Sequence, residues 1–379
     1  MTEPLPDPAL VADLVHALRG WYFTHRRRLP WRDDPTPYRV WVSEIMLQQT
    51  QVATVVPYFE RFIEAFPDIA SLAAASDEAL LARWSGLGYY RRAKHLHAAA
   101  RLVVERHGGV LPGTVAALLT LPGIGRYTAG AIASIAFGQR APVLDGNVAR
   151  VLSRVFEVAE AADSTPGQKR LWALAEALVP VDASSHNQAL MELGALVCSP
   201  RNPSCRVCPL TDRCRAQRAG RAQDYPRMDK KTVVKPMHAV AGLVLRGADS
   251  DELLLGKRPA EGLLAGLWEL PGTELVSPRS PRKKALTLAL RERTGLAVEV
   301  GDLIATVDHQ FTHRRLSLEI FATSLTQRAP ERPSPGAFYQ RLSWVSRRSA
   351  EAPALGPSQP SETPLSTLTR KVLAALARA

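Results

Sequence analysis

The sequence predicts a two-domain protein in which an all-α domain precedes a smaller α+β domain. Apolar residues recur at helical spacing through residues 7–215, and short turns with Gly or Pro separate the segments. From residue 237 the spacing changes to the alternation typical of β-strands. A polar and basic stretch, residues 216–236, lies between the two patterns and is expected to be a linker.

The first domain, residues 1–215, is expected to be built from amphipathic helices at Leu10–Thr24, Tyr38–Gln49, Thr54–Phe66, Arg91–Arg106, Arg126–Phe137, Val148–Val158, Lys169–Val179 and Ser185–Val197. The second domain, residues 237–347, should contain a helix at Arg282–Thr294 and strands at His238–Leu245, Glu252–Lys257, Val298–Thr306, Leu316–Thr323 and Gln340–Val345. Residues 348–379 begin with a Pro/Ser-rich tail and are expected to end in a helix at Leu365–Ala377.

Residues 114–137 predict two helices joined by a tight turn. Gly123 and Gly125 should permit positive φ values in that turn and the close approach of another backbone. The free amide groups at the start of the second helix favour an anion, and Arg126 adds a positive charge there. A simple connection between helices would look the same, so the turn alone leaves DNA binding and a purely structural role equally open.

One acid, Asp145, follows the turn within the string Leu144-Asp145-Gly146-Asn147. The turn and this acid together resemble the helix-hairpin-helix motif of the endonuclease III superfamily of DNA glycosylases. The resemblance implies that the hairpin, residues 114–137, grips a DNA backbone beside a catalytic carboxylate.

The four cysteines of the chain all lie in residues 198–214, with six, two and five residues between them. Four thiolates at such spacing form a closed ligand set for zinc or for an iron–sulfur cluster, and the spacing does not separate the two. Disulfides are disfavoured because we see no signal peptide. The pattern resembles the iron–sulfur loop of the same superfamily, which implies a [4Fe–4S] cluster held by Cys198, Cys205, Cys208 and Cys214.

A second informative acid, Glu44, lies on a predicted helix and is followed one turn later by the polar residues Gln48, Gln49 and Thr50. An isolated acid at this position would more often be a surface residue. The string Ser43 to Val52, however, resembles the catalytic segment of adenine DNA glycosylases of the MutY type. The resemblance covers roughly residues 10–215 and includes four further stretches: Pro30-Trp31-Arg32, Gly86-Leu87-Gly88-Tyr89-Tyr90, Gly125 to Gly130 and Asn187 to Cys198.

This resemblance implies a two-carboxylate mechanism for cleaving the bond between adenine and its sugar. Glu44 would protonate adenine N7 and then act as the base for water, and Asp145 would stabilise the cationic sugar. Their pKa values should be pushed apart, with that of Glu44 raised by apolar surroundings. Tyr127 and Asn147 would hold the pair and the sugar.

The remaining site residues are also implied by the matched motifs. Trp31, Arg32 and Glu192 match positions that line the base pocket, and Gln49 and Tyr89 match residues that fill the gap left by a flipped base. Core packing is the alternative for Trp31 and Tyr89. The full set of expected DNA contacts is Gln48, Gln49, Thr50, Tyr89, Gly123, Gly125 and Arg126.

Tyr127 indicates the subtype, because the bifunctional branch of the superfamily has lysine there. A phenol cannot form the Schiff base that strand cleavage requires. We therefore expect a monofunctional enzyme. The alternatives are a bifunctional glycosylase and lyase, and a non-catalytic DNA-binding protein whose cluster senses redox state.

Residues 237–347 resemble a Nudix-like domain, from Leu270-Pro271-Gly272 and from the string Arg291 to Leu296. A working Nudix site needs a cluster of carboxylates for Mg²⁺, but Ala289 and Arg293 stand where acids are expected. This disfavours a nucleotide pyrophosphohydrolase and favours a binding domain, and the resemblance to the C-terminal domain of adenine glycosylases implies that its ligand is 8-oxoguanine. The expected lesion-reading turn is Phe311, Thr312 and His313, where Thr312 replaces the usual serine; an ordinary turn at a strand end is the alternative.

The formal net charge of +12 and the pI of about 9.9 suit a polyanionic partner. With the resemblance, the expected partner is double-stranded DNA with adenine opposite 8-oxoguanine or guanine, bound by a monomer. No apolar stretch reaches the roughly 20 residues of a membrane span, so we expect no membrane partner. With reduced cysteines, we expect a cytoplasmic, nucleoid-associated protein.

Overall fold

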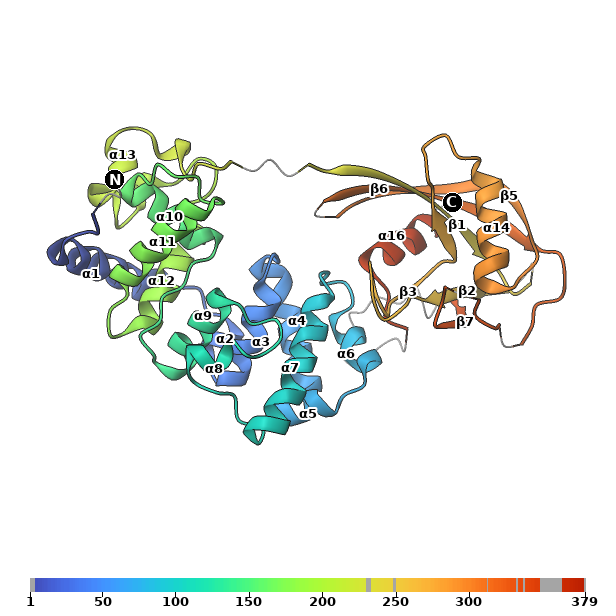
Figure 1. Ribbon diagram of the computed structural model, residues 1–379, viewed down its shortest axis with the longest axis horizontal. Coiled ribbons are helices and arrows are strands. Elements are labelled where there is room, and N and C mark those ends of the chain that lie inside the picture. The colour runs from blue at the N-terminus through green and yellow to red at the C-terminus, as the bar shows by residue number, and fades with distance from the viewer. Residues whose placement is uncertain are drawn as a thin grey trace. The chain divides into compact units, whose positions relative to one another are not determined.

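The computed structural model describes residues 4–229, 233–247, 250–311, 313–331, 333–336, 338–347 and 363–377. The chain forms two compact units, and the second one includes a segment from the first half of the sequence. Unit 1 comprises Met1–Ala74 and His95–Lys231, and unit 2 comprises Ala75–Lys94 and Thr232–Ala379. The predicted fold class, a helical domain followed by an α+β domain, is confirmed (Figure 1).

All the regular secondary structure in the described residues of unit 1 is helical. Its helices are α1 (Pro8–His25), α2 (Pro30–Asp33), α3 (Pro37–Leu47), α4 (Val52–Ala65), α5 (Ile69–Ala74), most of α7 (Arg91–His107), α8 (Val115–Leu118), α9 (Arg126–Phe137), α10 (Gly146–Phe156), α11 (Thr165–Leu178) and α12 (Ala183–Leu196). Prolines in the first turns of α1, α2 and α3 set where these helices begin. The apolar faces of α1, α10, α11 and α12 share one core, so the acid that precedes α10 rests on a rigid base.

The predicted hairpin is α8, the turn and α9. Gly123 has φ +78°, and a Cβ there would lie 2.7 Å from the His95 Cβ, so the turn needs glycine at this position. The expectation of a positive φ at Gly125 was wrong: this residue is the N-cap of α9 with φ −94°. No side chain caps the amides of α9 at this end, which leaves them available to an anion.

The expected linker is only partly a linker. Residues 215–229 fold against unit 1 as α13 (Arg215–Arg218) and the short 3-10 turn Ala222–Asp224, and the Tyr225 ring is buried. The Arg154 side chain donates a hydrogen bond to the Tyr225 carbonyl oxygen at 3.0 Å. The polar composition predicted the boundary too early, because the Tyr225 carbonyl is bound by a buried arginine and its ring packs in the core of unit 1.

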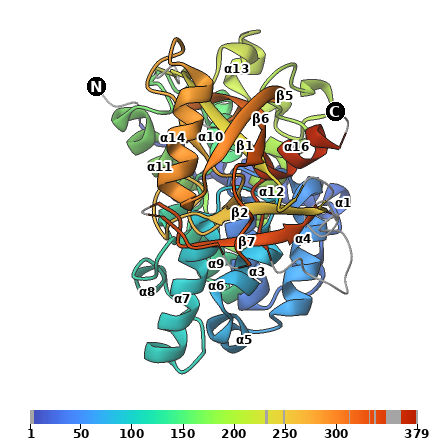
Figure 2. The same ribbon diagram turned by 90° about the vertical axis from the view of Figure 1, so that its right-hand side faces the viewer.

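Unit 2 is built on two sheets. One has the order β4 (Gly272–Glu274), β1 (Lys235–Val244), β6 (Arg314–Leu325) and β5 (Val298–Gln310), with β1 and β6 parallel. The other has the order β3 (Trp268–Glu269), β2 (Glu252–Lys257) and β7 (Arg341–Ser346). Helices α14 (Arg282–Thr294) and α16 (Thr367–Leu376) pack on separate cores, one on each side of the larger sheet (Figure 2).

The remaining helix of unit 2, α6 (Asp77–Trp84), comes from the first half of the sequence. It is followed by the tight loop Ser85–Tyr90, in which Gly86, Gly88 and Tyr89 all have positive φ. The sequence placed this segment in the first domain, but its packing groups it with the α+β unit. In the described part of the chain, none of the helices has the length and apolarity to cross a membrane.

Candidate active site

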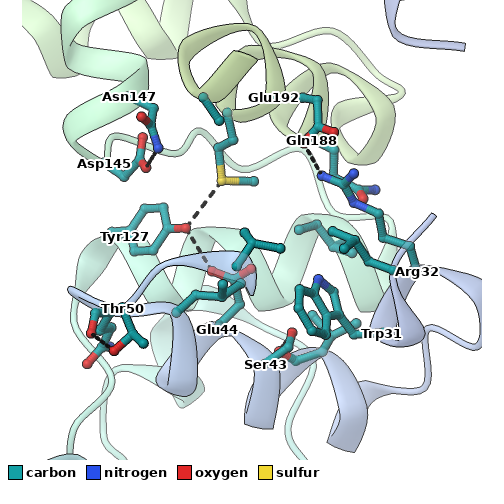
Figure 3. A pocket seen from close by; sticks show the side chains of 18 of the residues that line it. Trp31, Arg32, Ser43, Glu44, Thr50, Tyr127, Asp145, Asn147, Gln188 and Glu192 are labelled. Atoms are coloured by element: carbon teal, nitrogen blue, oxygen red, sulfur yellow. Dashed lines mark hydrogen bonds and ion pairs between the residues drawn. The ribbon is translucent and has the colours of Figure 1, made fainter. Parts of the chain in front are cut away.

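A cavity of about 1180 Å³ in unit 1 brings the two predicted acids together (Figure 3). Its walls come from α2, α3 and the start of α9 on one side, and from the start of α10 and from α12 on the other. The predicted residues that line it are Trp31, Arg32, Glu44, Gln48, Gln49, Thr50, Gly125, Tyr127, Asp145, Asn147 and Glu192. Residues far apart in the sequence thus share one concave surface, as the lining of a ligand site does.

Glu44 lies on α3 with only 5% of its surface exposed. Burial disfavours its carboxylate and raises the pKa of Glu44 from 4.5 to about 7, helped by the nearby charge of Asp145. The Tyr127 hydroxyl opposes this rise by donating a hydrogen bond to Glu44 Oε2 at 2.7 Å. The expected rise at Glu44 is therefore present, and near neutral pH a large share of this side chain carries a proton.

Tyr127 occupies the first turn of α9 and points across the cavity at Glu44 (Figure 3). Its oxygen also lies 3.2 Å from Met191 Sδ on α12. Burial, with the adjacent Glu44 and Asp145, raises the pKa of Tyr127 well above its ordinary value of 10.0. The phenol therefore stays protonated and acts as a hydrogen-bond donor.

Asp145 is the N-cap of α10, and its Oδ1 accepts a hydrogen bond from the Val148 amide at 2.7 Å. Its other oxygen accepts one from Asn147 Nδ2 at 2.9 Å. Burial raises the pKa of Asp145, and these hydrogen bonds oppose the rise. Both oxygens are held by partners on one rigid helix end, so the carboxylate has a fixed orientation in the cavity.

Glu192 on α12 is 1% exposed and holds two arginines at the side of the cavity. Arg27 binds both of its carboxylate oxygens, at 2.8 Å each, and Arg32 Nη2 lies 3.0 Å from Oε2. Burial alone would raise the pKa of Glu192, but hydrogen bonds from both arginines outweigh it and lower the pKa to about 2. Trp31 is buried against Phe59 yet also lines the cavity, so packing and pocket formation coexist there.

The polar trio after α3 forms another part of the wall. Gln48 Nε2 donates a hydrogen bond to Thr128 Oγ1 at 3.2 Å, which ties the end of α3 to α9. Gln49 is exposed and has φ +59°, a conformation that is uncommon outside glycine. Thr50 lines the cavity beside it.

Several predicted residues lie away from this cavity. Gly123 and Arg126 do not line it, and the Arg126 guanidinium stacks on Trp172 with 3.8 Å to the ring centroid. Tyr89, Phe311 and His313 belong to unit 2 and are described there. Thr312 lies outside the described residues.

The turn between β5 and β6 carries the expected lesion-reading residues. Phe311 is partly buried against the core that includes α16, and its ring meets that of His309 edge-on at 4.7 Å. His313 is exposed, and its carbonyl oxygen accepts a hydrogen bond from the Lys235 amide at 3.0 Å. In the described part of this turn, the Phe311 ring packs against the core and the His313 imidazole is exposed.

The four cysteines come together around a second, smaller cavity of unit 1. No three described His, Cys, Asp or Glu side chains converge as the ligands of a single metal ion would. Burial raises the pKa of Cys208 to about 12, and the other three thiols add to this rise. Four cysteine thiols around one cavity form a ligand set of the kind that holds zinc or an iron–sulfur cluster.

Arg150 and Arg154 on α10 connect this helix, which begins beside Asp145, to the cysteine loop. Arg150 Nη2 donates to Asn147 Oδ1 at 2.8 Å, and its Nε donates to the Cys198 carbonyl oxygen at 2.7 Å. Arg154 Nη1 lies 3.2 Å from Cys198 Sγ and 2.7 Å from the Ser199 carbonyl oxygen. One helix therefore carries the acid at its start and binds the loop along its side.

Sequence reasoning missed some of the residues that shape the cavity, mainly Arg27, Arg150, Gln188 and Met191. Arg27 precedes the matched motif by a few residues and is identified only by its partner Glu192. Met191 and Gln188 fall within the matched stretch Asn187 to Cys198, and the helical period does place them on the same face as Glu192. The helical period was therefore the sequence signal that could have identified Gln188 and Met191 as cavity residues.

Comparison with known proteins assigns each part of the chain to a family. Residues 42–177 match the HhH-GPD superfamily of base excision DNA repair proteins, and residues 240–375 match the NUDIX domain. Among solved structures, a thermostable thymine-DNA glycosylase superposes with a TM-score of 0.52 and 30% sequence identity, over 56% of this chain and 98% of that one.

Two curated relatives match both units. The chain is 39% identical over 390 residues to the adenine DNA glycosylase of Mus musculus, which covers 89% of this chain and 75% of that protein. It is 38% identical over 377 residues to the adenine DNA glycosylase of Homo sapiens, covering 86% of this chain and 69% of that protein. With this identity along most of its length, the chain belongs to the adenine DNA glycosylases, enzymes of base excision repair within the HhH-GPD superfamily.

Proposed function

We propose that this protein removes adenine mispaired with 8-oxoguanine or guanine, by hydrolysis of the N-glycosidic bond after the adenine has left the helix. The observation that carries this proposal is the pairing of Glu44, whose pKa lies near 7, with Asp145 in one cavity. Two carboxylates with different roles are what cleavage of a glycosidic bond needs. One chain forms the whole cavity, so we take the monomer as the acting unit.

In this mechanism the neutral Glu44 carboxyl donates its proton to adenine N7 as the bond to C1′ breaks. The base leaves as a neutral purine, and positive charge develops on the sugar. Asp145 stabilises that charge, because its orientation is already fixed by Val148 and Asn147. The Glu44 carboxylate then takes a proton from the attacking water, which returns the site to its starting state.

The base pocket would lie on the Trp31 side of the cavity. In the Arg27–Glu192–Arg32 cluster the carboxylate is paired with both guanidinium groups. A neutral purine beside it would therefore find hydrogen-bond donors and acceptors and no unpaired charge. Trp31 offers an aromatic face to the base. Gln49 and Tyr89, both exposed and at positive φ, are the residues proposed to fill the gap in the duplex.

The absence of a reactive amine favours a monofunctional reaction. Among the described residues that line the cavity, none is a lysine, and Tyr127 stands where a Schiff base would have to form. A phenol with a raised pKa remains a neutral donor at physiological pH. A bifunctional reaction would therefore need an amine from elsewhere.

We propose a [4Fe–4S] cluster in the cysteine loop, held by Cys198, Cys205, Cys208 and Cys214. When bound, it would organise the basic loop that carries these residues and could exchange electrons. Arg154 is placed to donate a hydrogen bond to Cys198 Sγ and so favour the thiolate. The cluster is expected to be lost in Cys198→Ser, with iron and acid-labile sulfide content as the measurement.

In unit 2 we propose that the turn 311–313 reads 8-oxoguanine. Arg293 stands where a Nudix enzyme would need an acid, and it donates a hydrogen bond to the Gly272 carbonyl oxygen at 2.6 Å. Ala289 is buried. Both features support a binding role for this unit over pyrophosphate hydrolysis.

The test is single-turnover cleavage of duplexes that hold adenine opposite 8-oxoguanine, guanine, cytosine or thymine, analysed with and without alkali. We expect breaks at adenine that depend on alkali and are fastest opposite 8-oxoguanine. Breaks without alkali would support the bifunctional alternative. Binding without base release would support a non-catalytic DNA-binding protein and overturn the roles of Glu44 and Asp145.

A further inference from the structure

The loop Ser85–Tyr90 combines buried side chains with one exposed ring. Ser85, Leu87 and Tyr90 are buried, whereas the Tyr89 side chain is 46% exposed. Three of the six residues have left-handed backbone, and the Gly88 carbonyl oxygen accepts hydrogen bonds from Trp84 Nε1 and Arg92 Nη2. Buried side chains and these hydrogen bonds therefore restrain the loop, and the Tyr89 side chain is its exposed aromatic group.

This loop is attached to the far end of the chain. Ser85 Oγ donates a hydrogen bond to the Leu365 carbonyl oxygen at 2.5 Å and accepts one from Arg370 Nη2 at 3.0 Å. Thr367 Oγ1 donates to the Gly86 carbonyl oxygen at 3.3 Å. Ser85 is 1% exposed, so these bonds form away from water, where an unpaired hydroxyl is costly.

The partner segment is itself part of the core that supports the lesion-reading turn. Leu368, Val372 and Leu373 of α16 pack in one cluster with residues of β1 and β6, and Phe311 packs against the same cluster. The Thr369 hydroxyl donates to the Trp268 carbonyl oxygen, which fixes α16 to β3. Helix α16 thus contacts the loop of Tyr89 on one side and the core beneath Phe311 on the other.

A second set of bonds holds α6 to the same unit. Lys257 Nζ on β2 lies 2.6 Å from Glu78 Oε1, and Lys94 Nζ donates to the Ala260 carbonyl oxygen at 2.9 Å. These contacts are consistent with the grouping of Ala75–Lys94 in unit 2.

We propose that α16 positions Tyr89 relative to the turn 311–313, with Ser85 and Arg370 as the positioning residues. The ring that enters the duplex and the turn that reads the lesion then belong to one rigid body, separate from the unit that carries the acids. The DNA contact of Tyr89 rests on the proposed function, whereas the attachment of its loop to α16 does not.

The first test uses free protein and amide hydrogen exchange. We expect Arg370→Ala to speed exchange of residues 86–92 about tenfold or more, while α3 and α9 exchange as before. Arg370→Lys, which keeps a donor, should restore part of the protection. Arg328→Ala removes the same charge from an exposed position and should leave residues 86–92 unchanged. Wild-type exchange at residues 86–92 in Arg370→Ala would overturn the proposal.

The second test uses a duplex with a 2-aminopurine beside the 8-oxoguanine, whose fluorescence rises when the stack opens. We expect Tyr89→Ala to weaken this signal by about tenfold, and Arg370→Ala or Ser85→Ala to weaken it similarly. In the Tyr89→Ala background, Arg370→Ala should have no further effect. Equal losses in both backgrounds would overturn the proposal, whereas an unaltered signal in Tyr89→Ala would remove that residue from the proposed function and leave hydrogen exchange to decide the attachment.

Discussion

The Tyr127 hydroxyl donates a 2.7 Å hydrogen bond to Glu44 Oε2, and this bond lowers a pKa that burial has raised. The two residues therefore set the proton affinity of the proposed acid between them. Burial alone would hold the proton too tightly for efficient transfer at neutral pH. The hydrogen bond brings the pKa of Glu44 back to about 7, where donor and base forms are both accessible.

Tyr127→Phe should move the pH dependence of base release. Without the hydroxyl the carboxylate of Glu44 loses a stabilising donor, so the pKa of Glu44 should rise further above 7. The rate of single-turnover base release should then decline at a higher pH than in the parent, even if the maximal rate is lower. A midpoint that stays in place or moves to lower pH would contradict this coupling.

Glu44→Gln should stabilise the folded protein at alkaline pH. The folded-state pKa of Glu44 is raised from 4.5 to about 7, so its favourable contribution is complete below pH 4.5 and is lost as the pH rises through 7. Glutamine does not ionise and avoids this loss, which is on the order of 3 kcal/mol for a buried group. Chemical unfolding at pH 5, 7 and 9 measures the difference, which should grow with pH. Equal stability of the two proteins at pH 9 would mean that the Glu44 carboxylate is solvated.

Asp145→Asn and Asp145→Ala should separate catalysis from folding. Asparagine caps a helix as well as aspartate does, so the first variant should keep its melting temperature, whereas alanine should cost about 1 kcal/mol. Both lack the carboxylate and should lose at least ~100-fold in the rate of adenine release. Duplex affinity of Asp145→Asn serves as the control and should match the parent. Turnover that survives in Asp145→Asn would exclude the acid from the chemistry.

Glu192→Gln should destabilise the protein in a pH-dependent way. The pKa of Glu192 is lowered from 4.5 to about 2, so its contribution is present above pH 4.5 and is lost as the pH falls through 2. Removing the charge leaves Arg27 and Arg32 without their partner, at a cost of about 2 kcal/mol near neutral pH, given the partial exposure of Arg27. Unfolding experiments at pH 7 and pH 3 should show a smaller difference between the variants at the lower pH. A constant difference would mean that packing, and not charge, is lost.

The sequence was sufficient for the long elements, because their signals are local. Helix α9 begins after Gly125 and ends at Gly138, whose φ of +64° stops the helix, as the apolar period and the glycines indicate. Helix α14 likewise begins and ends where the sequence predicts. Short helices such as α2, α5 and α6 were not predicted, since four to eight residues carry too little periodicity.

The matched motifs brought Glu44 and Asp145 into one site, but other relationships between distant residues could not be read from periods or motifs. Ser85 and Leu365 form a hydrogen bond although 280 positions separate them in the sequence. Helix α16, which follows Leu365, has the same amphipathic pattern as many other helices, so its sequence does not indicate this contact. Arg27 was overlooked for the same reason, because its partner Glu192 is 165 positions away. Such pairs form because polar groups that become buried on packing need hydrogen-bond partners. Which groups become buried together depends on the tertiary structure and cannot be seen in the local sequence.

The capping role of Asp145 has a consequence for inheritance. The residues that can replace it without harm to α10 are the other helix-capping residues, Asn, Ser, Thr and Gly, and none of these carries a negative charge. Under the proposed function, a single change to asparagine would therefore leave a well-folded protein that still occupies mispaired DNA and does not repair it. In a cell with two alleles, such a protein would compete with its functional counterpart for the same mispairs, so the altered allele would interfere with repair instead of being silent.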